Sequence, residues 1–244
     1  MTLHNRADLN AACHLACAPR FSYDDSRLFN NTPSPSYETA DQQFDLVAEI
    51  QSLGRLEPSD FDCNEIVNLF AILRGLSHPS IDLSRLSNSY TDRYSYSDVI
   101  YVVQRRLVSI CSVIPVQVTP VDSCCCWATL IYMHNIFYEV SFDSRVMEIL
   151  AERIISCIEQ LEHCGTLGEG YTVLTNREGF WMLVMASIAT KDKAHRNWLS
   201  SVLKVLCGGL GLETFISSRK VLMDILWNSK LDSRFQSLWT EINS

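Results

Sequence analysis

The second half of this chain carries one helical pattern after another, and no other feature of the sequence restricts the fold as strongly. From Pro120 to the C-terminus, apolar residues recur at the spacing of an amphipathic helix, with no interruption longer than a turn. Because this stretch has no pattern of paired strands, we expect an all-α protein. The helices predicted there cover residues 122–139, 143–164, 176–190, 192–207, 213–228 and 231–242.

Polar and glycine residues mark the expected ends of these helices. Asp143 and Asn176 are expected to begin two of them, because a short polar side chain accepts hydrogen bonds from the free N–H groups of a first turn. Gly165 and the pair Gly208-Gly209 are expected to end two others. The run Gly208-Gly209-Leu210-Gly211 superficially resembles a phosphate loop, but it follows a helix and lacks a lysine, so we interpret it as a helix end and turn.

Two further helices are expected before Pro120. One begins at Pro58-Ser59-Asp60 and stops at His78-Pro79, and the other is capped by Ser97 and ended by Pro115. The segment 113–121 contains prolines and has no partner strand, so we expect a loop there.

The N-terminal residues carry weaker patterns. A short helix over 3–18, a polar and proline-containing loop over 19–40 and a helix over 41–53 are expected. Since no fixed repeat period is present, we predict one irregular domain over residues 1–244, with about eight to ten helices.

Composition and charge narrow the function. The net charge is −8, and the sequence shows no concentrated Lys/Arg cluster that could neutralise phosphates. We therefore expect no nucleic-acid binding. The longest apolar candidate for a transmembrane segment, 124–138, is interrupted by His134 and Asn135 and is shorter than the roughly 18 residues that a span needs. Scattered cysteines and the lack of a signal-peptide pattern favour reduced thiols and an intracellular protein, cytoplasmic or nuclear.

The run Cys124-Cys125-Cys126 is the densest group of metal-ligating side chains. Successive residues on a helix diverge by about 100°, so these thiolates do not converge on one zinc ion. We interpret them as small packing residues and predict neither a metal nor a cofactor. Cys157, His163 and Cys164 complete a site only if tertiary contacts bring them to this run.

Large aromatic side chains are concentrated on the expected helices, where they either fill a core or line a cavity for an apolar ligand. The candidate ligand-binding residues are Trp127, Tyr132, His134, Phe180 and Trp181. The candidate catalytic residues are His134, whose imidazole titrates near neutral pH, and the hydrogen-bonding Tyr132 and Tyr101. No local motif of a nucleophilic hydrolase, a zinc protease or a P-loop protein is present in the sequence.

Four segments resemble the regulatory domain of fungal zinc-cluster transcription factors. The segment 128–134, ATLIYMH, is similar to a recurring A-x-L-I-Y-L-H segment, and 181–190 is similar to a W-P-L-F-I-A-G-x-E-A helix, with Met in place of Pro and a departure at its end. Residues 206–212 and 221–227 match a glycine-containing turn and the helix after it, which ends in tryptophan. The resemblance covers about 97–244 and implies a helical regulatory domain.

The chain departs from that family in one respect. The DNA-binding module of these factors needs six cysteines in two short basic clusters, whereas Cys13 and Cys17 are a lone pair without basic neighbours. A chain complete from Met1 is therefore not expected to bind DNA as these factors do.

Three functions remain open at this level. The first is a stand-alone regulatory domain that binds an apolar small molecule or a protein partner. The second is a metal-free cyclase or pericyclase of the Diels-Alderase type in fungal terpenoid or polyketide biosynthesis, which would hold reacting atoms together and offer one hydrogen bond. The third is a fragment of a DNA-binding activator. The sequence does not specify the oligomeric state.

Overall fold

The computed structural model describes residues 64–77, 96–112, 119–163 and 176–243, and every regular element in these ranges is a helix. The all-α prediction is confirmed for them. The predicted helices over 3–18 and 41–53 and the loop over 19–40 lie outside the described residues. The elements are α4 (Asn64–Ser77), α6 (Tyr96–Ser112), α7 (Pro120–Ile136), α8 (Arg145–His163), α10 (Arg177–Ala189), α11 (Lys193–Leu210), α12 (Phe215–Ile225), the 3₁₀ turn η3 (Ser229–Leu231) and α13 (Asp232–Ile242).

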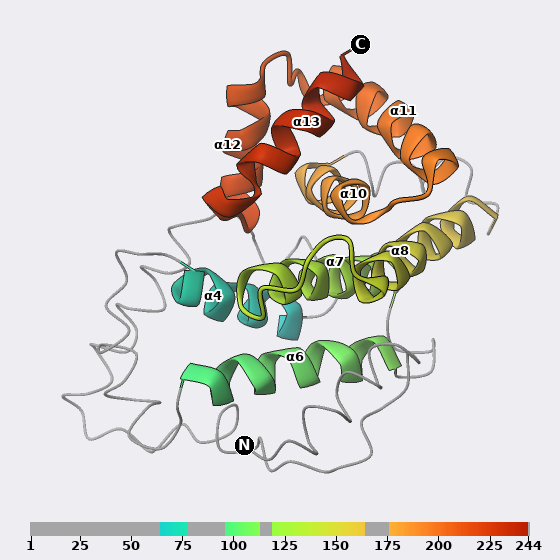
Figure 1. Cartoon of the computed structure of the whole chain (residues 1–244). Coiled ribbons are helices and arrows are strands. Elements are labelled where there is room, and N and C mark those ends of the chain that lie inside the picture. The colour runs from blue at the N-terminus through green and yellow to red at the C-terminus, as the bar shows by residue number, and fades with distance from the viewer. Residues whose placement is uncertain (1–63, 78–95, 113–118, 164–175, 244) are drawn as a thin grey trace.

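The helices are stacked in layers around α7 and α10 (Figure 1). Helix α7 packs against α6, α8 and α10, and α10 packs in turn against α8, α11, α12 and α13. Every residue of α10 from Gly179 to Ala189 is buried. A helix that is apolar on all faces is stable only when other elements surround it, which explains why α7 and α10 are central while the amphipathic α8, α11 and α13 cover them.

Local caps define where α7 and α8 begin. Helix α7 starts at Pro120 with a capping box in which Thr119 and Asp122 exchange hydrogen bonds, so the predicted loop over 113–121 ends earlier than expected. Residues 113–118 lie outside the described part. The start of α8 also differs from the prediction, because the hydroxyl of Ser144, rather than Asp143, accepts from the Met147 N–H at 3.4 Å.

Three other predicted boundaries have different outcomes. Asn176 caps α10 as predicted, accepting from the Gly179 N–H at 2.8 Å. Ser97 was wrongly predicted to cap a helix, since α6 already includes Tyr96. The predicted helix start at Pro58-Ser59-Asp60 and the predicted end at Gly165 lie outside the described residues.

Helix α11 continues through Gly208-Gly209, where the sequence predicted its end. It stops at Gly211, whose φ of 65° is left-handed. The Leu212 N–H donates to the Cys207 carbonyl at 2.8 Å and the Gly211 N–H to the Gly208 carbonyl at 3.3 Å, the two bonds of a Schellman motif. The glycine-rich run is thus a helix end and turn, as predicted, with the left-handed position three residues later than the first glycine.

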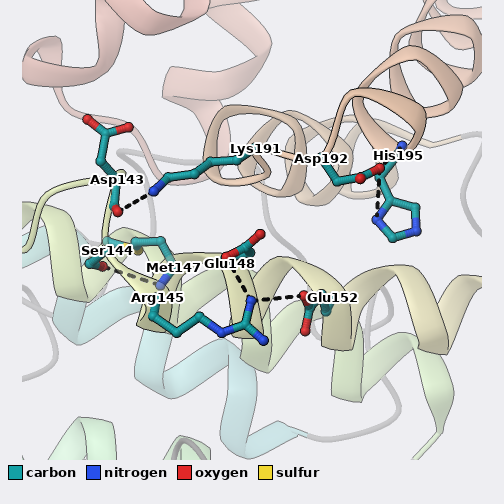
Figure 2. A network of polar contacts seen from close by, with 9 residues as sticks. All are labelled: Asp143, Ser144, Arg145, Met147, Glu148, Glu152, Lys191, Asp192 and His195. Atoms are coloured by element: carbon teal, nitrogen blue, oxygen red, sulfur yellow. Dashed lines mark hydrogen bonds and ion pairs between the residues drawn. The ribbon is translucent and has the colours of Figure 1, made fainter.

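Polar contacts on the surface join the start of α8 to the turn between α10 and α11 (Figure 2). The Lys191 ammonium donates to the Asp143 carbonyl. On α8, Arg145 contacts Glu148 at 2.7 Å and Glu152 at 3.4 Å. Exposed ion pairs contribute little to stability, so we expect this network to add little to the free energy of unfolding.

After α7 the chain reverses at Glu139, whose φ of 52° lies in the left-handed region. This region is costly for a residue with a Cβ atom. The Glu139 carboxylate forms an ion pair with Lys230 at 3.6 Å, which is exposed and therefore contributes little. We expect Glu139→Gly to raise the free energy of unfolding by about 1 kcal/mol, measured by urea denaturation. Glu139→Ala, which keeps the unfavourable backbone, is the control; equal effects of Gly and Ala would contradict the explanation.

No single helix among the described residues is long and apolar enough to cross a membrane. Helices α11 and α12 together have the length and apolar composition of a membrane span, but the angle between them is 92°.

Candidate functional site

Trp181 lies at the point where α10 meets α4 and the end of α12. Its indole N–H donates to the Leu226 carbonyl at 2.6 Å. Its ring stands edge-to-face with Phe70 of α4, with 5.3 Å between ring centroids and 68° between planes. Only 1% of the residue is exposed. The indole therefore joins three helices and has its polar atom paired within the protein.

Arg74 on α4 donates to the same end of α12, and sequence reasoning did not identify it. Its guanidinium donates to the Ile225 carbonyl and, at 3.0 Å, to the Asp224 carbonyl. Burial lowers the pKa of Arg74 to about 10, while the charge of Asp224 acts in the opposite direction. Because this value is far above neutral pH, the guanidinium remains charged. One sequence signal could have identified Arg74. It follows Phe70 by four residues, so it lies on the same helix face as the buried apolar residues of α4.

We call these contacts the α12-end junction: the carbonyls of Asp224, Ile225 and Leu226 with their donors Arg74 and Trp181. The last carbonyls of a helix have no partner within the helix, and a buried helix end needs donors from elsewhere. Arg74 and Trp181 supply them. The junction ties α4, α10 and α12 together, and its chemistry is that of a structural cap.

Tyr132 on α7 contacts α4 at a second point. Its hydroxyl donates to Ser77 at 2.9 Å, and the Ser77 hydroxyl donates to the Leu73 carbonyl at 2.7 Å. The ring packs edge-to-face on Phe137, with centroids 6.1 Å apart. The hydroxyl proposed as a hydrogen-bond donor for catalysis thus serves an interhelical contact in this structure.

His134 forms a polar pair with Gln104 between α7 and α6. The Nε2 atoms of the two side chains are 3.3 Å apart, and the residues are 4% and 2% exposed. The amide N–H donates to the ring when Nε2 carries no proton, which places the imidazole proton on Nδ1. The ring also lies 5.6 Å from that of Tyr138. A polar pair among apolar side chains can hydrogen-bond one group of a bound molecule.

The remaining candidates are buried in different parts of the core. Phe180 stands edge-to-face with Phe235 of α13, with centroids 6.4 Å apart. Trp127 and Tyr101 are buried on α7 and α6. By helical spacing, Trp127 shares a face of α7 with His134, and Tyr101 shares a face of α6 with Gln104. The candidates therefore divide between the α6–α7 interface, the contact with α4 and the C-terminal layer.

The three consecutive cysteines of α7 are all buried. Within the described ranges, no group of three or more His, Cys, Asp or Glu side chains is placed to hold a metal ion. Cys157 does reach this run, since it contacts Cys124. The side chains of His163 and Cys164 lie outside the described residues.

Asp232 joins α12 to α13 and supplies a test of pH dependence. It accepts from Arg219 at 2.8 and 2.9 Å and from the Trp227 indole at 2.9 Å. Burial would raise its pKa, but these hydrogen bonds and the guanidinium charge outweigh burial, and the pKa is lowered. A carboxylate with a depressed folded pKa stabilises the protein above its unfolded pKa, and this contribution is lost as pH falls through the folded value.

We therefore expect Asp232→Asn to lower the free energy of unfolding by about 1 kcal/mol at neutral pH. The difference from wild type should shrink as pH drops below about 4, the usual range for an aspartate. Urea denaturation from neutral to acidic pH measures it. Arg219→Gln removes the same pair and should reproduce the trend; a difference that is constant with pH would contradict this account.

The helical array and its junction define an all-α domain in which apolar central helices are enclosed by amphipathic ones. Residues 45–242 match the family model described as the fungal specific transcription factor domain, and the chain belongs to that family. This match begins at residue 45, whereas the resemblance described from the sequence alone begins at about residue 97. No curated protein and no solved structure matches the chain.

Proposed function

We propose that this protein is a regulatory domain of the fungal transcription factor family that binds an apolar small molecule carrying one hydrogen-bonding group. Membership of the family supports the regulatory role. The observation that carries ligand binding is the buried pair of His134 and Gln104 in the α6–α7 interface. Protein sites for small molecules are mostly apolar with a few placed polar groups. The buried Trp127 and Tyr101 share helix faces with His134 and Gln104 by helical spacing, which supports an apolar surrounding for the pair.

Retention of a compound tests the proposal. The full chain is incubated with an organic extract of its host and examined by native mass spectrometry and chromatography. A retained, unchanged compound is the expected result. An isomer of unchanged mass would instead support the cyclase alternative, which neither the family nor the geometry favours. If nothing is retained, the small-molecule proposal fails and a protein partner becomes the better explanation.

We expect His134→Leu to weaken binding of the retained compound at least tenfold, corresponding to about 1.4 kcal/mol, because it removes the polar group but keeps an apolar side chain. Isothermal titration with the purified compound measures this. Ser218→Ala is the matched control, since Ser218 is buried on α12 and its hydroxyl has no hydrogen-bond partner among the residues that the structure describes. Equal affinities of the His134→Leu variant and wild type would place the ligand elsewhere.

We also propose that the domain does not bind DNA by itself and acts inside the cell, in the cytoplasm or the nucleus. The net charge of −8, which is repelled by a phosphate backbone, supports the absence of DNA binding. Membership of the family supports the location. In fluorescence anisotropy with random-sequence duplex DNA at low salt, we expect no binding at micromolar protein. Saturable binding would contradict this and favour the activator alternative.

A further inference from the structure

Two cysteines meet where α7 packs on α8. The Cys124 thiol on α7 lies 3.7 Å from the Ile154 carbonyl oxygen, which it approaches as a donor. Cys157 follows Ile154 by three residues, so its side chain lies on the same face of α8. The Cys157 side chain is also close enough to the Cys124 thiol to interact with it. The two sulfur atoms are therefore neighbours across the helix interface.

The two thiols have different surroundings. Cys124 is fully buried, whereas Cys157 is partly exposed. The interaction with Cys124 lowers the pKa of Cys157; burial opposes this, and the charge of Arg153 adds to the lowering. The same interaction, with burial, raises the pKa of Cys124. Cys157 is therefore the sulfur of the pair that an oxidant in solution can reach.

We propose that Cys124 and Cys157 form a redox modification site at which a hydroperoxide converts the two thiols into a disulfide between α7 and α8. The Cys157 thiolate attacks one peroxide oxygen, the O–O bond breaks, and the departing oxygen takes up a proton to leave as water or an alcohol. Cys157 is now a sulfenic acid. The Cys124 sulfur then attacks the Cys157 sulfur, the S–O bond breaks, and the Cys124 proton leaves with the hydroxyl group as water. Two electrons pass from the thiols to the peroxide.

The disulfide would hold α7 against α8. Helix α7 also carries Tyr132 and His134, which contact α4 and α6. The link would close a long loop of chain between residues 124 and 157, and cross-links of this kind restrict the unfolded state. Oxidation would therefore reduce the freedom of α7 to move relative to α8.

The reduced full-length protein is treated with a small excess of hydrogen peroxide and digested without reductant. We expect a linked peptide pair containing Cys124 and Cys157, lighter by two hydrogen atoms than the reduced pair. Formation of the link should raise Tm by about 5 °C, reversibly on addition of dithiothreitol. Absence of the linked pair, or a link from Cys157 to another cysteine, would overturn the proposal.

Variants separate the two roles. In Cys124→Ala we expect no link, and a sulfenic acid at Cys157 that a diketone probe traps. Because Cys124 is buried and its replacement can impair folding, Cys157→Ser at the partly exposed position is the second variant, and it should abolish the Tm shift. Cys207→Ala is the control, because burial raises the pKa of Cys207 to about 11. This control should keep the shift, and its loss would count against the assigned pair.

Discussion

Replacing Trp181 with alanine is expected to lower the free energy of unfolding by about 4 kcal/mol, the largest effect predicted for this protein. The indole is buried, packs edge-to-face on Phe70 and donates to the Leu226 carbonyl. Truncation would leave a large cavity between α4, α10 and α12 and remove a donor from a buried carbonyl. Urea denaturation followed by circular dichroism measures the change without relying on tryptophan fluorescence.

The size of this effect also distinguishes a packed core from a ligand cavity. Trp181→Phe keeps most of the ring and loses only the hydrogen bond, so we expect a loss of about 1–2 kcal/mol. Trp198→Phe, at a partly exposed position of α11, is the matched control and should cost much less. If Trp181→Ala cost less than about 1 kcal/mol, the side chain would not fill a core, and a ligand cavity beside it would become the better interpretation.

The second large effect is expected at Arg74. Arg74→Met keeps an apolar stem of similar length but leaves the carbonyls of Asp224 and Ile225 without their donor at the α12-end junction. Hydrogen bonds from a charged donor are stronger than neutral ones, and unpaired buried carbonyls are costly, so we expect a loss of about 3 kcal/mol. The burial that lowers the pKa of Arg74 offsets part of the gain from these bonds in the wild type.

Arg74→Lys is the matched control because it keeps the charge but not the planar fork of donors. It should lose a smaller part of the stability. Since Arg74 and Trp181 serve adjacent carbonyls, Arg74→Met and Trp181→Phe should be non-additive by at least about 0.5 kcal/mol in a double-mutant cycle. Additive effects would mean that the two donors act independently and that the junction is not a unit.

The helices of the second half were predictable from the sequence because their signals are local. Apolar spacing located α10 and α13 closely, and Asn176 marked the start of α10. The boundary errors were also local in origin. Ser144 competes with its neighbour Asp143 for the same capping role, and glycine is permitted in the last turn of α11 as well as after it.

The family was recognisable from apolar and aromatic spacing, whereas the arrangement of the candidate side chains was not. Trp181 and Tyr132 both contact α4, through Phe70 and Ser77, although α4 lay outside the resemblance recognised in the sequence. Spacing along α7 predicts that its three cysteines diverge. It did not indicate that Cys124 would meet Cys157 of α8, because that contact depends on how two helices pack.

The sequence by itself determined that this protein is helical, where most of the described helices of its second half lie and which family it resembles. These properties depend on residues within a few turns of one another, whose spacing is written in the chain. The tertiary structure alone decided that Arg74 caps α12, that His134 pairs with Gln104 and that Cys124 meets Cys157. Each of these contacts joins different helices, and their relative placement follows from the packing of the whole core rather than from any local pattern.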